Sequence, residues 1–591
     1  MATKGKVIGI VANLVTVEVD GPVGQNEICE IDLLQATALA ETIKIDGNKA
    51  FVQLFQSSRG LKIGNKAVFL GHMLEVELGP GMLSKRFDGL QSDLDKFTGV
   101  FLKSGEKSRA LDEKVNWHFK PRVKKGDTVA AGSWLGEVKE GWIPHKIMAP
   151  FGLLAEGTIT SIVPEGEYTV DSKIASIKAG NEEIRVNLSQ RWPIKLPIKA
   201  YTSKPRAYKL LETSVRVMDT LNPLVEGGTG FIPGPFGCGK TVLQHAIASN
   251  AEADIVVIAA CGERANEVVE IFVEFPELDD PRTGRKLMER TIIVANTSNM
   301  PVAAREASVY TAMTIAEYYR QMGLKVLLLA DSTSRWAQAL REMSNRLEEL
   351  PGPDAYPMDL PAVIANFYAR AGLVNLPDNT TGSVTFIGTV SPAGGNMKEP
   401  VTESTKKVAR CFYGLAQHRS DAKRYPSIDP LDSYSKYLEY AEVQEYLAQK
   451  ISPVWVSLVL KAKDILRRGK EAHDQINILG DDSVPLEYHD RFWKSEMIDF
   501  IILQQDNFDP VDKSTSMERQ KYMLEKIMGI VAQKFTYTGF ADVAPFFKKV
   551  INILKQMNYS EFKSKKFNQY EEELQLFLTE QAIKEKEPSL A

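Results

Sequence analysis

Hydrophobic and polar positions divide the chain into four regions that differ in period. In the first region, short β-branched runs recur between Gly and Asn turns, at a spacing typical of a small β-barrel. The predicted strands fall at 6–10, 14–19, 27–31, 39–45, 50–55 and 66–70. We therefore predict an N-terminal β-barrel over residues 1–72. A connecting segment, 73–111, follows and includes a short helical stretch at about 87–96.

The second region, residues 112–195, is also rich in β signals but differs in character. We expect two short strands with a turn in 123–132, and further strands in 153–162 and 168–178. This pattern predicts an all-β insert with its own small core. The segment His145-Lys146-Ile147-Met148-Ala149-Pro150 faintly resembles the lysine hairpin of biotinyl and lipoyl domains, but it lacks their Met-Lys-Met or Asp-Lys centre. A structural β-sandwich is therefore favoured over a modified Lys146.

In the third region, 196–435, apolar strands alternate with amphipathic helices. The predicted strands are 228–232, 254–260, 291–296, 325–331 and 383–390. Strands that are apolar throughout indicate a parallel sheet covered on both faces.

The fourth region, 436–591, has mostly helical periodicity. Helices are predicted at 441–450, 454–469, 490–506, 517–535, 546–557 and 562–586, with Pro453 separating the first two. Residues 584–588 are predicted to be a frayed, solvated end.

Composition narrows the functional classes. With 72 Lys and Arg against 76 Asp and Glu, the chain has a net charge of −4, and nothing global favours nucleic acid. The four cysteines (Cys29, Cys238, Cys261 and Cys411) form no spaced cluster, so they indicate neither a zinc site nor a disulfide framework and suggest a reducing compartment. The N-terminus lacks a signal peptide's apolar core, and no apolar run is long enough to span a bilayer. We therefore expect any link to a membrane to go through partner subunits.

The strongest chemical signal is a phosphate-loop pattern, G-x-x-x-x-G-K-[ST], in Gly234-Pro235-Phe236-Gly237-Cys238-Gly239-Lys240-Thr241. Gly237 and Gly239 allow the tight turn in which backbone N–H groups converge on an anion. Lys240 is expected to place its charge on the β- and γ-phosphates, and the Thr241 hydroxyl is suited to ligate Mg²⁺. The helix predicted from Val242 onward points its positive dipole end at the phosphates. This pattern predicts binding of a nucleotide.

Charged side chains follow two of the apolar strands, at the edge where open parallel sheets gather catalytic groups. Glu263, after strand 254–260, is placed to polarise a water for in-line attack on the γ-phosphate, and Arg264 to brace the transferring group. The role of Glu267, which has Arg264 within reach, stays open. Asp331, which ends strand 325–331, is expected to orient Mg²⁺ or its water shell.

Two further residues near these motifs have competing interpretations. Arg335 has three: a contact with a neighbouring subunit, a place near the Mg²⁺ shell, or a structural ion pair. Cys238 is favoured as a small residue that fills a tight space. The alternative is a thiol whose pKa is lowered at a helix N-terminus, which reagents would modify and nucleotide would protect.

These motifs together resemble the catalytic A subunit of V-type and A-type rotary ATPases, in its bacterial form, over nearly the whole chain. The matching segments are 234–241, Gly262-Glu263-Arg264, 329–336, 391–395 and 425–433. The insert resembles the bulge domain that separates A subunits from the shorter F-type β subunits. Intact Lys240 and Glu263 distinguish the chain from the non-catalytic B subunit.

The resemblance implies a RecA-like phosphate-loop core with a parallel sheet, set in an α/β multidomain chain. It implies that Tyr425 packs on adenine and that Phe508 forms a second wall. It also implies that Mg²⁺ is the cofactor and ATP or ADP the substrate, with Asp331 acting on the ion through water. The expected partners are B subunits in an alternating A3B3 hexamer, one of which supplies an arginine in trans, together with stalk subunits. The membrane sector that moves H⁺ or Na⁺ is reached indirectly, from the cytoplasmic face.

Three alternatives remain open from the sequence. A flagellar or secretion-type export ATPase has the same core, but the β insert argues against it. An RNA-translocating hexamer of the Rho type needs a basic, aromatic RNA channel, which the net acidity disfavours. A regulatory nucleotide-binding subunit would never turn over, and replacing Glu263 by Gln in a reconstituted ring would decide between it and a catalytic subunit.

Overall fold

The computed structural model describes residues 2–33, 37–96, 108–298 and 300–584, so the predicted frayed end at 584–588 lies almost wholly outside the described residues. The chain divides into two compact units. Unit 1 comprises Met1–Ala207, Ala253–Val390 and Asn396–Val408, and unit 2 comprises Tyr208–Glu252, Ser391–Gly395 and Ala409–Ala591. Each unit is described by itself.

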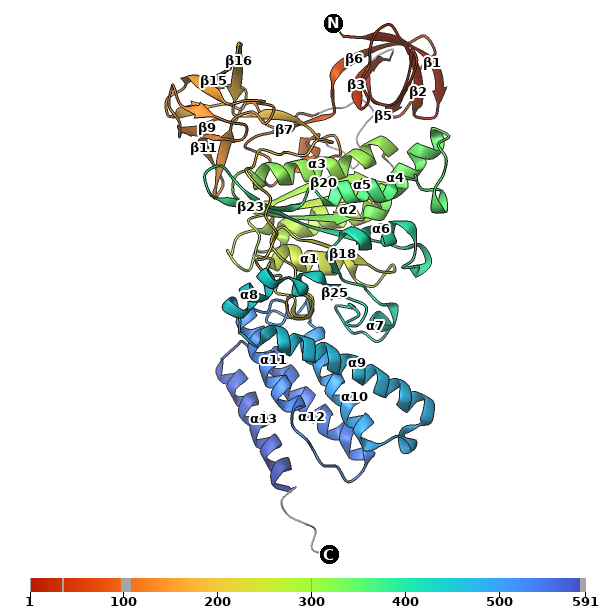
Figure 1. Ribbon diagram of the computed structural model, residues 1–591, viewed down its shortest axis with the longest axis vertical. Helices are drawn as coiled ribbons and strands as arrows, with labels where there is room; N and C mark the ends of the chain where they lie inside the picture. The colour runs from red at the N-terminus through yellow and green to blue at the C-terminus, as the bar shows by residue number, and fades with distance from the viewer. Residues whose placement is uncertain (1, 34–36, 97–107, 299, 585–591) are drawn as a thin grey trace, which may run out of the picture. The chain divides into compact units, whose positions relative to one another are not determined.

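Unit 1 begins with a closed β-barrel, whose strands curl around one another in Figure 1. Its strand order is β1-β2-β5-β4-β3-β6, and all pairs between neighbours are antiparallel. Alternate side chains such as Val15, Val17, Val52 and Phe69 fill the interior without exposure to solvent. The predicted barrel is therefore confirmed, and its strands are β1 Lys4–Val11, β2 Leu14–Val19, β3 Glu27–Asp32, β4 Thr37–Asp46, β5 Lys49–Leu54 and β6 Lys66–Met73.

The connecting segment contains strand where a helix was predicted. After β7 (Glu75–Leu78), the chain forms β8 (Arg86–Phe87), in which Phe87 pairs in parallel with Val294. Only the 3₁₀ turn at Leu94–Lys96 agrees with the helical stretch predicted at 87–96. The reason lies in tertiary packing, because Phe87 is fully buried and a Cβ on Gly89 would lie 2.4 Å from the Ala304 carbonyl oxygen. Residues 97–107 of this segment lie outside the described residues.

The insert is a β-sandwich built from two four-stranded sheets. Their orders are β10-β13-β15-β16 and β12-β11-β9-β14, and Phe119, Leu135, Ile159 and Ile177 lie in the shared core. The bounds are β9 Trp117–Pro121, β10 Thr128–Val129, β11 Trp134–Glu140, β12 Ile143–Met148, β13 Gly157–Ile162, β14 Gly166–Tyr168, β15 Lys173–Ala179 and β16 Glu182–Asn187. Of the two strands predicted in 123–132, only β10 is present. A last strand, β17 (Gln190–Pro193), leaves the insert and pairs with β7.

Lys146 lies within strand β12 and not at the tip of a hairpin. Its ammonium group pairs with Glu137 and lies 5.3 Å from the centre of the Trp134 ring. These contacts satisfy the charge locally and support the structural interpretation of this lysine.

The α/β part of unit 1 is a parallel sheet in the order β23-β21-β19-β20-β8, with β22 (Gly372–Asn375) antiparallel on β23. The strands β19 (Ile255–Glu263), β20 (Thr291–Thr297), β21 (Lys325–Asp331) and β23 (Thr381–Val390) are buried along almost their whole length, as predicted for a covered parallel sheet. Helix α3 (Val302–Arg320) packs on β19, β20 and β21 (Figure 1). The other helices are α2 Ala265–Glu274, α4 Thr333–Arg346, α5 Leu360–Tyr368 and α6 Pro400–Val408.

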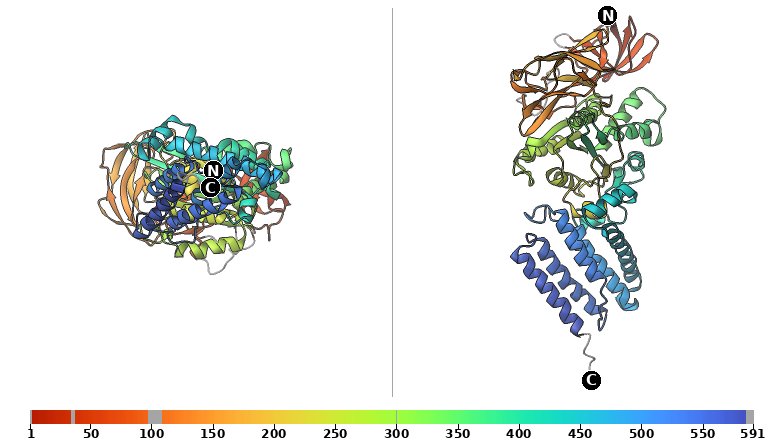
Figure 2. Two further views of the ribbon diagram at one scale, coloured as in Figure 1. Left: turned by 90° about the horizontal axis from the view of Figure 1, so that it is seen from below. Right: turned by 60° about the vertical axis from the view of Figure 1, so that its left-hand side comes forward.

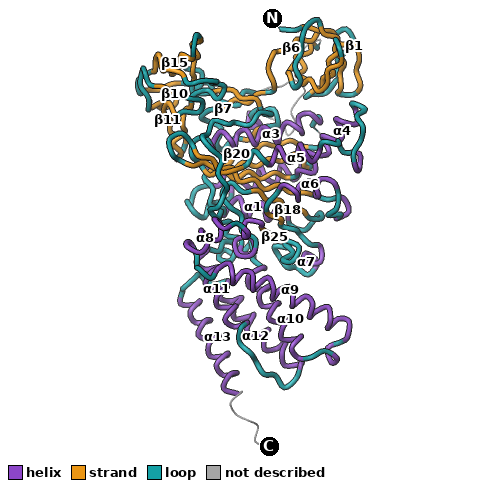
Figure 3. Tube along the Cα trace, in the orientation of Figure 1, coloured by secondary structure: helices purple, strands orange, loops and turns teal. Residues whose placement is uncertain are grey.

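Unit 2 contains a small sheet and a helical domain, which Figure 3 distinguishes by colour. Strand β18 (Thr229–Pro233) is parallel to β24 (Cys411–Phe412), and β25 (Tyr434–Ser435) is antiparallel to β24. Helix α1 (Lys240–Asn250) follows β18, and the short α7 (Gln417–Asp421) follows β24.

The long helices of the C-terminal domain run side by side, which the right-hand view of Figure 2 shows best. As predicted, Pro453 separates α8 from α9, whereas the helix predicted at 490–506 ends at Ile498 and continues as one π-helical turn, Asp499–Leu503. The helices are α8 Ala441–Lys450, α9 Trp455–Leu479, α10 Leu486–Ile498, α11 Met517–Val531, α12 Phe540–Asn558 and α13 Lys565–Lys584. Among all described residues, no helix combines the length and apolar character needed to cross a bilayer.

Candidate nucleotide site

The phosphate loop of unit 2 joins β18 to α1. Gly237 and Gly239 both have φ of +83°, a left-handed conformation that glycine adopts without the penalty of a Cβ. Gly239 is the N-cap of α1, so the helix begins at Lys240 and the backbone N–H groups of its first turn face the loop. A Cβ on either glycine would meet no atom within 4 Å, so backbone conformation and not crowding requires glycine here.

Lys240 is held against the loop that precedes it. Its ammonium group donates hydrogen bonds to the carbonyl oxygens of Gly234 (2.7 Å) and Pro235 (2.8 Å). The next residue, Thr241, is exposed to solvent in the first turn of α1, and the Phe236 ring is 79% exposed at the loop tip. The lysine and threonine of the motif are therefore on the accessible side of the helix start.

Cys238 is buried within the phosphate loop, with 1% of its surface exposed. Its Sγ lies 3.3 Å from Oε1 of Gln417, and burial raises the pKa of the thiol despite the nearby charge of Lys240. A raised pKa is the opposite of what a reactive helix-start thiolate needs. The structure therefore supports the packing role and contradicts the alternative of a lowered pKa.

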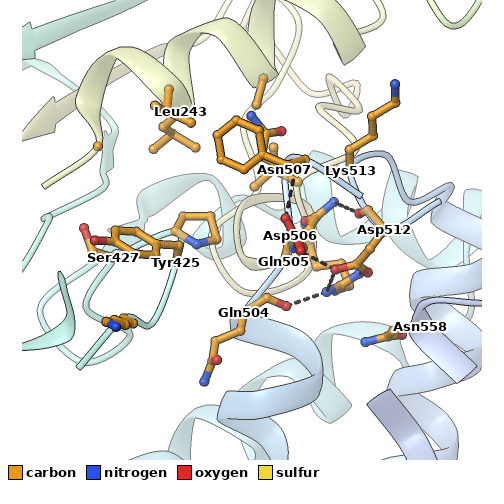
Figure 4. Close-up of a pocket in the computed structure, with 18 of the residues that line it drawn as sticks. Leu243, Tyr425, Ser427, Gln504, Gln505, Asp506, Asn507, Asp512, Lys513 and Asn558 are labelled. Atoms are coloured by element: carbon orange, nitrogen blue, oxygen red, sulfur yellow. Dashed lines mark hydrogen bonds and ion pairs between the residues drawn. The ribbon is translucent and has the colours of Figure 1, made fainter. Parts of the chain in front are cut away.

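A cavity of about 500 Å³ in unit 2 opens beside the loop and is shown in Figure 4. Gly237, Cys238, Gly239 and Val242 line one part of it, and Tyr425 lines another. The Tyr425 ring is 45% exposed, and its hydroxyl lies 3.1 Å from Oγ of Ser420. An accessible ring whose polar end is already satisfied fits a flat, apolar partner.

Phe508 also lines the cavity and is 87% exposed. It belongs to a loop after the C-terminal π-helical turn, of which Figure 4 labels Gln504, Gln505, Asp506 and Asn507. The structure therefore places Tyr425 and Phe508 around the same cavity as the glycines of the phosphate loop.

The position of the Phe508 loop depends on a buried ion pair that the sequence motifs did not indicate. Arg216, 1% exposed, pairs with Asp512 and also donates to the Gln504 carbonyl oxygen. Asp512 in turn accepts the backbone N–H of Asp506 at 2.7 Å, and Gln505 accepts the backbone N–H of Arg216 at 2.8 Å. Nearly 300 residues separate the two partners in the chain, so no local pattern could have indicated the pair.

The predicted carboxylates lie in unit 1, at the carboxyl edge of its parallel sheet. Ala260 pairs with Asp331 in the β19–β21 register, and Glu263 is the last residue of β19. Burial raises the pKa of Glu263 to about 8, and the charge of Asp331 and a hydrogen bond with Glu267 contribute in the same direction. Asp331 accepts a 2.6 Å hydrogen bond from the Thr389 hydroxyl. Glu263 is thus poised to hold or release a proton near neutral pH.

The two predicted arginines differ in their surroundings. The Arg264 side chain is 56% exposed and lies 3.9 Å from the Glu267 carboxylate. Arg335 is partly buried and donates to Oε1 of Gln338 at 3.2 Å. A Cβ on Gly262 would lie 3.2 Å from the Arg335 Cβ, so the chain passes tightly between these residues.

Thr241 in unit 2 and Asp331 in unit 1 each offer an oxygen ligand, the kind that Mg²⁺ prefers beside water and phosphate oxygens. The Thr241 hydroxyl is exposed, and Asp331 presents a carboxylate at the sheet edge. Within the described ranges, no group of three or more His, Cys, Asp and Glu side chains is arranged to hold a metal by itself.

Comparisons with known proteins match three consecutive regions of the chain. Residues 7–71 match the beta-barrel domain of the ATP synthase alpha/beta family, and residues 108–195 match the barrel-sandwich domain of ATP synthase alpha/beta subunits. Residues 214–435 match the nucleotide-binding domain of the ATP synthase alpha/beta family.

Full-length relatives support the same assignment. The chain is 47% identical to the V-type ATP synthase alpha chain of Treponema denticola, over 98% of this chain and 97% of that one. It is 48% identical to the protein of the same name from Borrelia hermsii, over 97% of both chains, and 46% identical to that from Borreliella burgdorferi, over 97% and 98%. Similarity over the whole length, insert included, excludes the export ATPase and the Rho-type hexamer. The chain belongs to the family of V-type ATP synthase alpha chains.

Proposed function

We propose that this chain binds ATP and ADP at residues 234–241 and is the subunit of a V-type ATP synthase that hydrolyses or forms ATP. The observation that carries the proposal is the loop at the start of α1, which opens onto a cavity of about 500 Å³ with accessible aromatic rings. The loop suits phosphates, and the rings suit an adenine base.

The proposed domains are 1–72, 73–111, 112–195, 196–435 and 436–591.

In the nucleotide complex, Lys240 exchanges its two carbonyl acceptors for phosphate oxygens. Thr241 would bind Mg²⁺ directly, and Asp331 would bind it through water. The ion would neutralise charge on the phosphates. Tyr425 and Phe508 hold the base.

Glu263 acts as the group that takes the proton of the attacking water. The raised pKa makes the ionised Glu263 a stronger base than an ordinary glutamate, and ionisation of Glu263 must precede proton transfer because its pKa of about 8 favours the protonated form at pH 7. Glu267 shares that proton through its hydrogen bond to Glu263, and Arg264 braces the transferred phosphoryl group.

The proposed partners are B subunits that alternate with this chain in an A3B3 ring and supply an arginine in trans, worth on the order of 10³ to 10⁵ in rate. Stalk subunits transmit the motion to a membrane sector that carries H⁺ or Na⁺. Because the arginine comes from a partner, we expect the chain alone to bind nucleotide but to hydrolyse it poorly.

Substitution of Glu263 by Gln in a reconstituted complex tests the proposal. We expect ADP binding to persist while the hydrolysis rate falls at least 100-fold, since one general base typically contributes 10²–10⁴-fold. Replacing the exposed Glu270 of α2 by Gln provides a matched control, for which we expect the wild-type rate. Unchanged hydrolysis in the Glu263→Gln complex would instead support a regulatory subunit.

A further inference from the structure

A second cavity, of about 490 Å³, lies in unit 1 and is separate from the nucleotide pocket. It is formed by the segment that follows the insert and by helices α3 and α5. Five cationic side chains and one carboxylate, that of Glu317, are among its lining residues. The cations are Lys195, Lys199, Lys204, Arg320 and Arg370.

Two of these cations are neutralised by carboxylates. Arg370 binds both oxygens of Glu317, at 3.1 and 2.6 Å, so the one carboxylate that lines the cavity among the described residues is already paired. Lys195 pairs with Glu41 at 2.9 Å and lies 3.5 Å from Glu306. These contacts leave Lys199, Lys204 and Arg320 without a carboxylate ion pair among the described residues.

Arg320 is fully buried at the end of α3. It donates to the carbonyl oxygens of Arg370 (3.1 Å) and Ile198 (2.8 Å), and its guanidinium carbon lies 5.3 Å from the centre of the Tyr201 ring. Its Nε–H is buried and has no hydrogen-bond partner within the described part of the chain. Carbonyl oxygens satisfy donors but carry no net charge, so a buried positive charge remains at the cavity wall.

Lys204 lines the same cavity as Arg320. Its ammonium group donates to the Ala369 carbonyl oxygen at 2.5 Å, and its stem lies so close to Gly372 that a Cβ there would be 2.2 Å from Cε. Burial and the charge of Arg320 lower the pKa of Lys204 to about 8, although Glu317 acts in the opposite direction. The positive charges of Lys204 and Arg320 therefore lie close enough in this cavity to repel each other.

The remaining lining residues indicate which kind of ligand suits the cavity. Tyr201 and Tyr310 carry hydroxyl groups, and Val363 and Phe367 add apolar surface. A volume of about 490 Å³ lies within the range of small-molecule sites. Lysine and arginine together are the usual partners of phosphate oxygens.

We propose that this cavity is a binding site for a small phosphate-bearing anion with at least two negative charges, held by Lys199, Lys204 and Arg320. The site is distinct from the phosphate loop and takes no part in the proposed hydrolysis. An organic phosphate would place its non-phosphate part against Val363 and Phe367.

Calorimetric titration of the full chain with inorganic pyrophosphate tests the proposal. The Lys240→Ala background weakens the phosphate loop, so binding at the second cavity can be measured separately. We expect one pyrophosphate per chain in this background, and at least a tenfold loss of affinity when Lys199→Gln and Lys204→Gln are added. Both lysines are solvent-accessible, so these changes should not unfold the chain.

Lys173→Gln and Lys178→Gln form the matched control, because they remove two charges from exposed lysines of the insert and should leave affinity unchanged. Lys204→Arg, which keeps the charge, should retain most of the affinity. At pH 8, binding should take up protons in the Lys240→Ala chain but not when Lys204→Gln is added. Absence of binding in the Lys240→Ala chain, an equal loss in the control, or equal affinity for succinate would overturn the assignment.

Discussion

The hydroxyl of Ser427 donates a 2.7 Å hydrogen bond to the carbonyl oxygen of Cys238. This bond joins the segment that carries Tyr425 to the middle of the phosphate loop, and both residues are buried. The segment that carries Tyr425 and the phosphate loop are therefore held together within unit 2.

We expect Ser427→Ala to weaken ADP binding about three- to tenfold, because one buried hydrogen bond contributes about 1 kcal/mol. The matched control is Ser457→Ala, since Ser457 makes a similar 2.8 Å bond to a carbonyl oxygen at an exposed position. Calorimetric titration of both variants with ADP measures the difference. Equal affinities would show that the bond does not organise the site.

Tyr425→Ala should lower the affinity for ADP by roughly 10- to 100-fold, since stacking of a base on an aromatic ring contributes about 1–3 kcal/mol. Tyr425→Phe should bind almost as well as the wild type, because Ser420 is the only residue of the described chain to which the hydroxyl group is hydrogen-bonded. Calorimetric titration of both variants with ADP separates the contribution of the aromatic ring to affinity from that of the hydroxyl group. A Phe variant as weak as the Ala variant would contradict a stacking role.

Lys240→Ala should reduce ATP affinity at least tenfold and reduce hydrolysis by the reconstituted complex at least 100-fold, since the cation is lost both from the bound phosphates and from the transition state. Lys461→Ala removes an exposed lysine of α9 and provides the control. Equilibrium binding and steady-state rates measure the two effects. Hydrolysis at the wild-type rate in the Lys240→Ala complex would be incompatible with the proposed role.

The pKa of Glu263 predicts a dependence of stability on pH. Because its folded pKa of about 8 exceeds the ordinary value of 4.5, the folded chain favours the protonated form. The stabilisation from that proton is complete below about pH 4.5 and is lost as the pH rises through 8. Glu263→Gln resembles the protonated form, so its Tm should exceed that of the wild type at pH 9.

Calorimetric scans of the nucleotide-free chain at pH 6 and pH 9 measure this effect, and the difference in Tm should be smaller at pH 6. A Gln variant that melts below the wild type at both pH values would refute the assigned environment of Glu263.

His145 predicts a stability effect that does not involve the residues proposed to bind nucleotide. It is fully buried in unit 1, with Nδ1 2.6 Å from Glu140 and Nε2 2.8 Å from the Tyr318 hydroxyl. His145→Ala would remove one hydrogen-bond partner from the buried Glu140 carboxylate, whose other oxygen still accepts the backbone N–H groups of Gly81 and Leu83, and would cost about 1–3 kcal/mol. His118→Ala is the control, because His118 contacts Glu165 and Glu167 at the surface. Thermal unfolding should show a large decrease in Tm only for His145→Ala.

The sequence predicted those features that depend on residues close to one another in the chain. The phosphate loop depends on glycine and lysine within eight residues, and Asp331 ends its strand as predicted, whereas β19 continues three residues beyond its predicted end and includes Glu263. The six barrel strands were predicted from their period alone, within a few residues of their observed bounds.

Features determined by contacts between distant residues were missed. Phe87 was assigned to a short helical stretch, but it pairs with Val294 more than 200 residues later. His145 resembled part of a modified hairpin, yet its partner Tyr318 lies on α3. The Arg216–Asp512 pair likewise has no sequence signature, since each residue alone resembles an ordinary surface charge.

The resting arrangement of Lys240 has a consequence for ligand discrimination. Any anion that enters the loop must compensate for two good hydrogen bonds, to Gly234 and Pro235, before the lysine turns toward it. In the proposed complex a nucleotide makes further contacts through its base with Tyr425 and Phe508, whereas orthophosphate has no base to place there. We therefore expect the loop to bind nucleotides in preference to orthophosphate.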